Sequence, residues 1–98
     1  MKKLYFDTSE DFEKFFSKRS KDYTDLIVEQ IEKSMLKNKK HAFICQIVFS
    51  TEKTAFEISI PAPEFVVALE SCLDFYHENE NADEAIECWK LLECAKVY

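Results

Sequence analysis

The spacing of apolar residues changes near residue 41, and this change limits the folds that the chain can adopt. Before it, apolar residues recur every three or four positions, as they do on one face of a helix. From His41 to Ile60 they lie in two segments rich in β-branched and aromatic residues, HAFICQIVFS and TAFEISI, and the second alternates cleanly. After Pro61 the helical spacing returns. The sequence therefore predicts a single α+β domain, residues 1–98, in the order α-α-β-β-α-α.

The residues before the first strand predict two helices. Thr8, followed three residues later by Asp11, is typical of a helix start, so we expect a helix at about 9–19. A second apolar stripe predicts a helix at about 23–38, and the basic KNKK that ends it complements the helix dipole. The sequence leaves open whether the two helices are continuous. Their apolar faces hold Phe12, Phe15, Phe16, Ile27, Ile31 and Met35.

The two strands predict a two-stranded antiparallel hairpin. Its connection, STEK, lacks glycine, which favours a four-residue loop built on a type I turn over a tight primed turn. Both faces of the first strand are largely apolar, so we expect that strand to be covered on both sides or to lie at a partner interface.

The last third of the chain predicts an antiparallel helical hairpin. Pro63 suits the first turn of a helix that runs to about residue 78, and Asn81 with Glu84 is typical of a second helix start. Trp89 falls among the apolar positions, so we place it in the core; the alternative is an exposed recognition surface. The predicted inward positions are Phe65, Leu69, Cys72, Leu73, Tyr76, Ala85, Cys88, Trp89, Leu92 and Ala95.

Composition excludes several classes of function. The chain has 98 residues and no glycine, which rules out glycine-rich phosphate loops and the dinucleotide fingerprint. It has no apolar run long enough to span a membrane, and its start, MKKLYFDTSEDF, does not resemble a signal peptide, so we expect a cytosolic protein. A domain of this size has a modest core, and self-association as a homodimer would add to its stability.

The cysteines predict neither a disulfide framework nor a metal site. In a reducing compartment we expect all four thiols to be free and to pack as small apolar groups. A zinc site from Cys72, His77, Cys88 and Cys94 is disfavoured, because residues six apart on a helix point about 240° apart. The sequence therefore predicts no cofactor and no metal.

No catalytic group emerges from the histidines. His41 and Cys45 should share a strand face, but two strand repeats place them about 13 Å apart, beyond hydrogen-bond reach. His77 ends an acidic helix, which would only keep it protonated. A small enzyme with an unrecognised thiol or carboxylate site remains an alternative.

Acidic residues concentrate in the second half of the chain. Residues 1–40 carry a net charge of about +2 and residues 41–98 about −8. Carboxylates at i, i+4 and i+8 form a stripe on the first helix of the tail, and more follow around the turn. This surface is a solvated face, a divalent-cation site or, as we predict, a dock for a basic partner, and it repels nucleic acid. The predicted partner-binding residues are Glu70, Asp74, Glu78, Glu80, Asp83 and Glu87.

The order of these segments resembles a known group of proteins. A lysine-rich helix, a strand pair ending in FEISIP and the tail FVVALESCLDFYHENENADEAIECWKLLECAK are similar to small accessory proteins of T-even-type marine tailed phages. Those proteins end in a helix with a LexxLexy pattern, an acidic turn and a YExCaxl helix. The resemblance covers about residues 25–96, and the tyrosine of the last motif is absent here. It implies a small phage protein that acts by binding.

Three hypotheses of function follow. The first is a non-enzymatic protein–protein interaction module in a bacterial cytosol that binds a host or phage protein, or itself as a homodimer. The second is an acidic nucleic-acid mimic that occupies a nucleic-acid-binding protein. The third is the small enzyme considered above.

Overall fold

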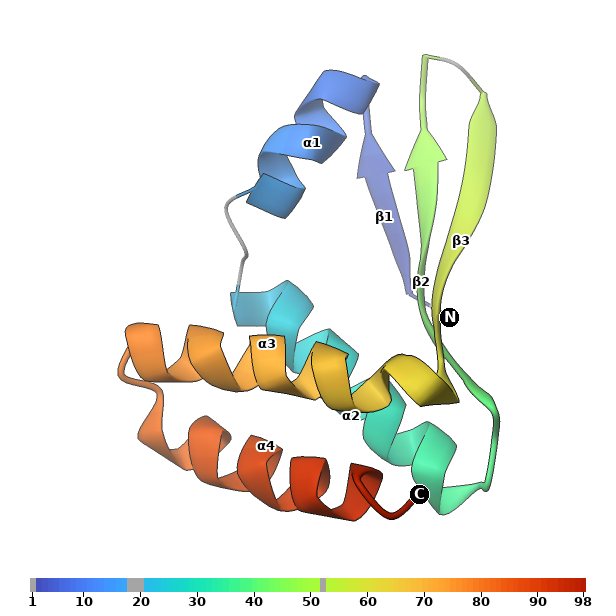
Figure 1. The fold of residues 1–98 in the computed structure, drawn as a ribbon. Helices are drawn as coiled ribbons and strands as arrows, with labels where there is room; N and C mark the ends of the chain where they lie inside the picture. The colour runs from blue at the N-terminus through green and yellow to red at the C-terminus, as the bar shows by residue number, and fades with distance from the viewer. Residues whose placement is uncertain (1, 18–20, 52) are drawn as a thin grey trace.

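The computed structural model describes residues 2–17, 21–51 and 53–98. Within these residues it confirms the α+β class, with four helices and a three-stranded sheet (Figure 1). The predicted order lacked one strand: β1 precedes the first helix and makes the sheet three-stranded, whereas the predicted antiparallel pairing of the next two strands is confirmed. The elements are β1 (Lys3–Phe6), α1 (Ser9–Ser17), α2 (Lys21–Leu36), β2 (His41–Phe49), β3 (Thr54–Pro61), the 3-10 turn η1 (Ala62–Glu64), α3 (Phe65–Glu78) and α4 (Ala82–Ala95).

Strand β1 is the element that the sequence analysis missed. It pairs in parallel with β2, with Lys3 opposite Gln46 and Phe6 opposite Phe49, and the sheet order is β1-β2-β3. A strand of four residues is too short for a clear alternation, and its partner lies about 40 residues away in the chain. Central β2 therefore has a neighbour on both edges.

A β-bulge explains why β2 is apolar at consecutive positions. The register between β2 and β3 shifts between Phe43 and Cys45, so Ile44 is an extra residue. Both Ile44 and Cys45 are buried as a result, whereas His41 and Phe43 are exposed on the opposite face, where they line a groove beside the end of α2. The prediction that His41 and Cys45 share a face was therefore wrong. Of the two alternatives for β2, cover on both sides does not hold at His41 and Phe43, and a partner interface stays a prediction.

Helix α1 packs on the covered face of the sheet through aromatic rings. The Phe12 ring lies 5.5 Å from that of Phe6, 5.7 Å from that of Phe49 and 5.9 Å from that of Phe56, in edge-to-face geometry. The predicted start of this helix is confirmed, since the Asp11 N–H donates to Thr8 Oγ1 at 3.2 Å. Its predicted end at residue 19 lies outside the described residues, as does the Phe16 side chain.

Helices α2, α3 and α4 pack together below the sheet, and α3 and α4 form the predicted hairpin (Figure 1). The Tyr76 hydroxyl on α3 donates to Asp25 Oδ1 on α2 at 2.5 Å, and the Cys88 thiol on α4 donates to the Leu69 carbonyl at 3.4 Å. These two hydrogen bonds tie α3 to both neighbours. Asn81 occupies the N-cap position of α4, but its side chain makes no capping hydrogen bond.

Two side chains that were predicted to face the core are exposed. Trp89 is 53% exposed, and Cys94 also lies at the surface. The buried positions of α4 are Ala85, Cys88, Leu92 and Ala95, all on one arc of the helix. Trp89 is about 100° around the helix from Cys88, at the border of that arc, and its ring extends outward.

Candidate protein-interaction site

An apolar groove runs along the outer side of the α3–α4 hairpin. Its volume is about 520 Å³, and almost all of its lining is apolar. The small side chains of Ala82 and Ala85 leave the hollow between the helices. Bulkier residues border it. The lining residues are Leu73 and His77 of α3 and Ala82, Ala85, Ile86 and Trp89 of α4.

Two large apolar side chains stand open to solvent at this groove. Ile86 is 54% exposed and Trp89 is 53% exposed. They are three residues apart on α4, so they lie next to each other along one helix face. An exposed tryptophan beside an apolar hollow is typical of a protein-binding surface, because tryptophan contributes a large contact area with few rotatable bonds.

The predicted acidic stripe lies beside this groove. Glu70, Asp74 and Glu78 are all exposed on α3, and around the helix they lie on one side of Leu73, which lines the groove. No described lysine or arginine forms an ion pair with any of these three carboxylates. The stripe is therefore an uncompensated negative rim on one side of an apolar hollow.

The remaining predicted carboxylates are not on the same surface. Asp83 and Glu87 lie on the side of α4 that faces α2, where they line a second groove of about 370 Å³. Glu80 lies in the α3–α4 turn and has a positive φ of 57°. The structure thus divides the predicted set in two. The second groove is lined by Asp25, Val28, Glu29, Glu32, Tyr76, Asp83, Glu84 and Glu87.

The α2 carboxylates of this second groove were missed by the sequence analysis. Asp25, Glu29 and Glu32 are spaced i, i+4 and i+7, which also places them on one helix face, so a signal of the same kind was present. The N-terminal 40 residues have a positive net charge, and this concealed it. Only the packing of α2 against α4 shows that the two acidic faces meet.

Lysines neutralise much of the second groove. Lys21 Nζ lies 2.9 Å from Asp25 Oδ2 and 3.3 Å from Glu84 Oε1, and these hydrogen bonds raise the pKa of Lys21. Glu29 pairs with a lysine one turn away at 2.9 Å, and Glu87 pairs with one at 3.5 Å. The groove between α3 and α4 is therefore the better candidate site, because its acidic rim is uncompensated.

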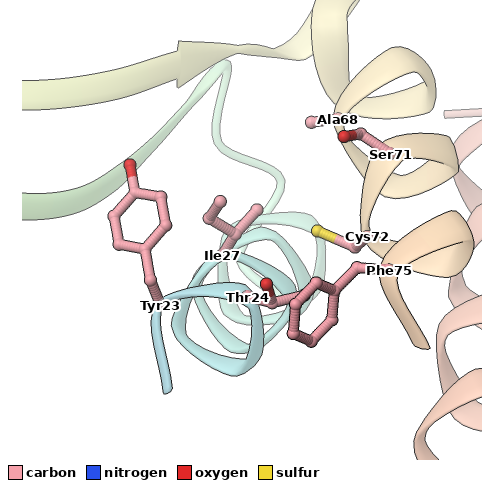
Figure 2. A pocket seen from close by; sticks show the side chains of 7 residues that line it. All are labelled: Tyr23, Thr24, Ile27, Ala68, Ser71, Cys72 and Phe75. Atoms are coloured by element: carbon pink, nitrogen blue, oxygen red, sulfur yellow. The ribbon is translucent and has the colours of Figure 1, made fainter. Parts of the chain in front are cut away.

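A third, smaller cavity contains a cysteine (Figure 2). It has a volume of about 190 Å³ between α2 and α3, and Tyr23, Ser71 and Cys72 are among its polar linings. In Figure 2 the Tyr23 hydroxyl points toward the strands, while the Cys72 sulfur points toward Ile27. Burial is the main cause that raises the pKa of Tyr23, and no histidine lines the cavity. The lining residues thus include neither a histidine nor a carboxylate, the usual bases beside a reactive thiol.

The buried thiols of Cys45 and Cys88 are not activated either. Burial raises the pKa of Cys88 to about 11 and also raises that of Cys45, so both are protonated at neutral pH. Within residues 2–17, 21–51 and 53–98, no group of three or more histidine, cysteine, aspartate or glutamate side chains has an arrangement suited to a metal ion.

Comparisons with known proteins do not assign the chain to a family. No protein-family model matches it, and no curated protein and no solved structure shows significant similarity to it. None of the described helices is both long enough and apolar enough to cross a membrane.

Proposed function

We propose that this protein is a non-enzymatic interaction module that binds a basic amphipathic helix of a partner protein in the groove between α3 and α4. The exposed Trp89 beside that groove is the observation that carries the proposal. Ile86 and Trp89 would contact the apolar face of the partner helix, as in other helix-in-groove complexes.

The charges around the groove define the chemistry of the partner. Glu70, Asp74 and Glu78 lie along α3, so lysine or arginine residues beside the apolar face of the partner helix would meet them. Attraction between opposite charges at the rim mainly accelerates association, whereas the buried apolar anchors determine how slowly the complex dissociates. A partner with an apolar i, i+3/i+4, i+7 face and basic flanks fits both features.

A designed peptide pair tests the proposal. One peptide has leucines at i, i+3, i+4 and i+7 with lysine and arginine flanks, and its control has the same leucines with glutamate flanks. Intrinsic fluorescence, which Trp89 dominates, should shift to the blue with the basic peptide and remain unchanged with the acidic one. Binding should weaken as salt is added. If neither peptide binds, or both bind equally, the groove does not have this role.

Variants at Trp89 and at the acidic stripe distinguish the effect of the apolar anchor on dissociation from the effect of the charges on association. Trp89→Ala should reduce affinity for the basic peptide by about 2 kcal/mol or more, mainly through faster dissociation, as expected of a hot-spot residue. Charge reversal of Glu70, Asp74 and Glu78 to lysine should slow association, and because solvated charges add little stability, melting should stay within a few degrees of wild type. An unchanged association rate in the triple variant would show that the acidic stripe is a solvated face and does not bind the peptide.

A second candidate function is that of an acidic nucleic-acid mimic. The groove between α2 and α4 favours it, because six of its eight lining residues are carboxylates. Such a mimic would occupy a nucleic-acid-binding protein through charge alone. Glu29→Lys with Glu32→Lys should abolish that binding and leave binding of the basic peptide at the α3–α4 groove intact, so the two candidates give opposite results.

The biological setting follows from the resemblance to phage accessory proteins and is part of the proposal. In that setting the module acts in the cytosol of an infected bacterium, on a host protein or a phage protein. Affinity capture from infected cells with the wild type and the Trp89→Ala variant would identify a partner that requires the groove.

A further inference from the structure

The covered face of the sheet is incomplete along β3. Phe56, Ile58 and Ile60 point to the same face as the core residues of β2, yet Phe56 is 43% exposed and the two isoleucines are only partly buried. β3 is an edge strand, because among the described residues it pairs with β2 alone. A stripe of apolar side chains thus reaches the open edge of the sheet.

The main chain of β3 is available for pairing at alternate residues. The Ala62 N–H, just after the strand, donates toward β2, to the Lys40 carbonyl at 2.7 Å. Main-chain groups along a strand point alternately to its two sides, so those of Ser59 and Glu57 point away from β2. A long edge strand with free N–H and C=O groups is a template for another strand.

The side chains of β3 are complementary to a second copy of β3 in one antiparallel register. With Ile58 opposite Ile58 of the second copy, Phe56 lies opposite Ile60 and Glu57 lies opposite Ser59. The strands then overlap from Ala55 to Pro61, with the free main-chain groups of Glu57 and Ser59 facing each other. This register continues the apolar stripe across the edge.

The neighbouring registers are less favourable. A shift in one direction places Glu57 directly opposite Glu57 of the second copy, and like charges at facing positions destabilise a strand pair. A shift in the other direction shortens the overlap to Glu57–Pro61. Only the register centred on Ile58 avoids both penalties.

We propose that two copies of this protein associate through antiparallel pairing of their β3 strands, centred on Ile58. The product is a homodimer with one continuous sheet in the order β1-β2-β3-β3-β2-β1. Its two-fold axis is perpendicular to the sheet, so the helices of both copies cover the same face. Ile60 of the second copy covers the exposed part of Phe56. The α3–α4 groove takes no part in this contact.

Sedimentation velocity over a series of concentrations tests the proposal. The wild type should shift from one chain of 11.6 kDa toward twice that mass as concentration rises. Ser59→Glu places a carboxylate opposite Glu57 at two symmetric positions, and it should raise the dissociation constant about two- to thirty-fold. Ser59→Lys, at the same exposed position, should lower the dissociation constant by a similar factor.

A double variant checks the register. Glu57→Lys combined with Ser59→Glu restores opposite charges across the pair and should return the dissociation constant toward that of the wild type. Melting curves at low concentration confirm that each variant folds. A wild type that remains a monomer at the highest concentration reached, or equal dissociation constants for Ser59→Glu and Ser59→Lys, would overturn the proposal. Neither result affects the peptide-binding test of the α3–α4 groove.

Discussion

Replacement of Trp89 by alanine separates a core tryptophan from a surface anchor. A fully buried tryptophan changed to alanine costs about 3–5 kcal/mol of folding free energy. Trp89 is 53% exposed, so it buries roughly 100 Å² of the 150–250 Å² that a large aromatic side chain can bury. At about 25 cal/mol per Å² this area corresponds to about 2.5 kcal/mol, an upper value because the unfolded chain already buries part of it. We therefore expect a loss of about 1–2 kcal/mol.

A matched control is available on the same helix. Leu92 is 5% exposed, so Leu92→Ala should cost about 2–5 kcal/mol despite the smaller side chain. Urea denaturation followed by far-ultraviolet circular dichroism suits both variants, since Trp89→Ala removes the only tryptophan. In a domain of this size, each kcal/mol lowers Tm by about 4–8 °C.

The stability losses of Trp89→Ala and Leu92→Ala, compared with each other, show whether Trp89 is a core residue or a surface residue. If Trp89→Ala loses as much stability as Leu92→Ala or more, the tryptophan is a core residue and cannot anchor a partner without unfolding. Acrylamide quenching of the wild type gives an independent readout. Trp89 should be quenched readily in the native protein, and a bound peptide should protect it.

Three further predictions concern thiols, pH and hydrogen bonds. A thiol reagent should modify about one cysteine per native chain, Cys94, and all four in denaturant, because the other three are buried; rapid native modification of all four would contradict this. Burial raises the pKa of Cys88 from 9.0 to about 11. The protonated thiol therefore contributes its full stabilisation below about pH 9, and this stabilisation is lost as the pH rises toward 11. Tm should fall over that interval, and it should fall less in Cys88→Ala. Tyr76→Phe, which removes the hydrogen bond to Asp25, should cost about 1.5–3 kcal/mol. Tyr98→Phe should cost less, because the shorter bond of its hydroxyl, to the Lys39 carbonyl, is exposed and its acceptors are uncharged. Equal losses in urea denaturation would refute this order.

Local patterns predicted the helices and the acidic stripe. A helix has a fixed period, so the spacing of Glu70, Asp74 and Glu78 placed them on one exposed face without knowledge of any neighbour. The start of α1 at Thr8 and the α3–α4 hairpin followed from capping residues and a short connection in the same way. The second acidic groove has the same kind of signal on α2, but its existence depends on which helix α4 packs against.

The sequence by itself determined the mixed class, the position of most elements and the charge of the second half of the chain, because periodicity and composition act over a few residues. Tertiary structure alone decided the rest. β1 became a strand because β2 offered it an edge, and the bulge at Ile44 reversed the faces of β2. Trp89 lies at the border of the buried arc of α4, so its side chain could turn inward or outward, and only the packing of α4 on α3 through Ala85, Cys88 and Leu92 left its ring half exposed beside the groove.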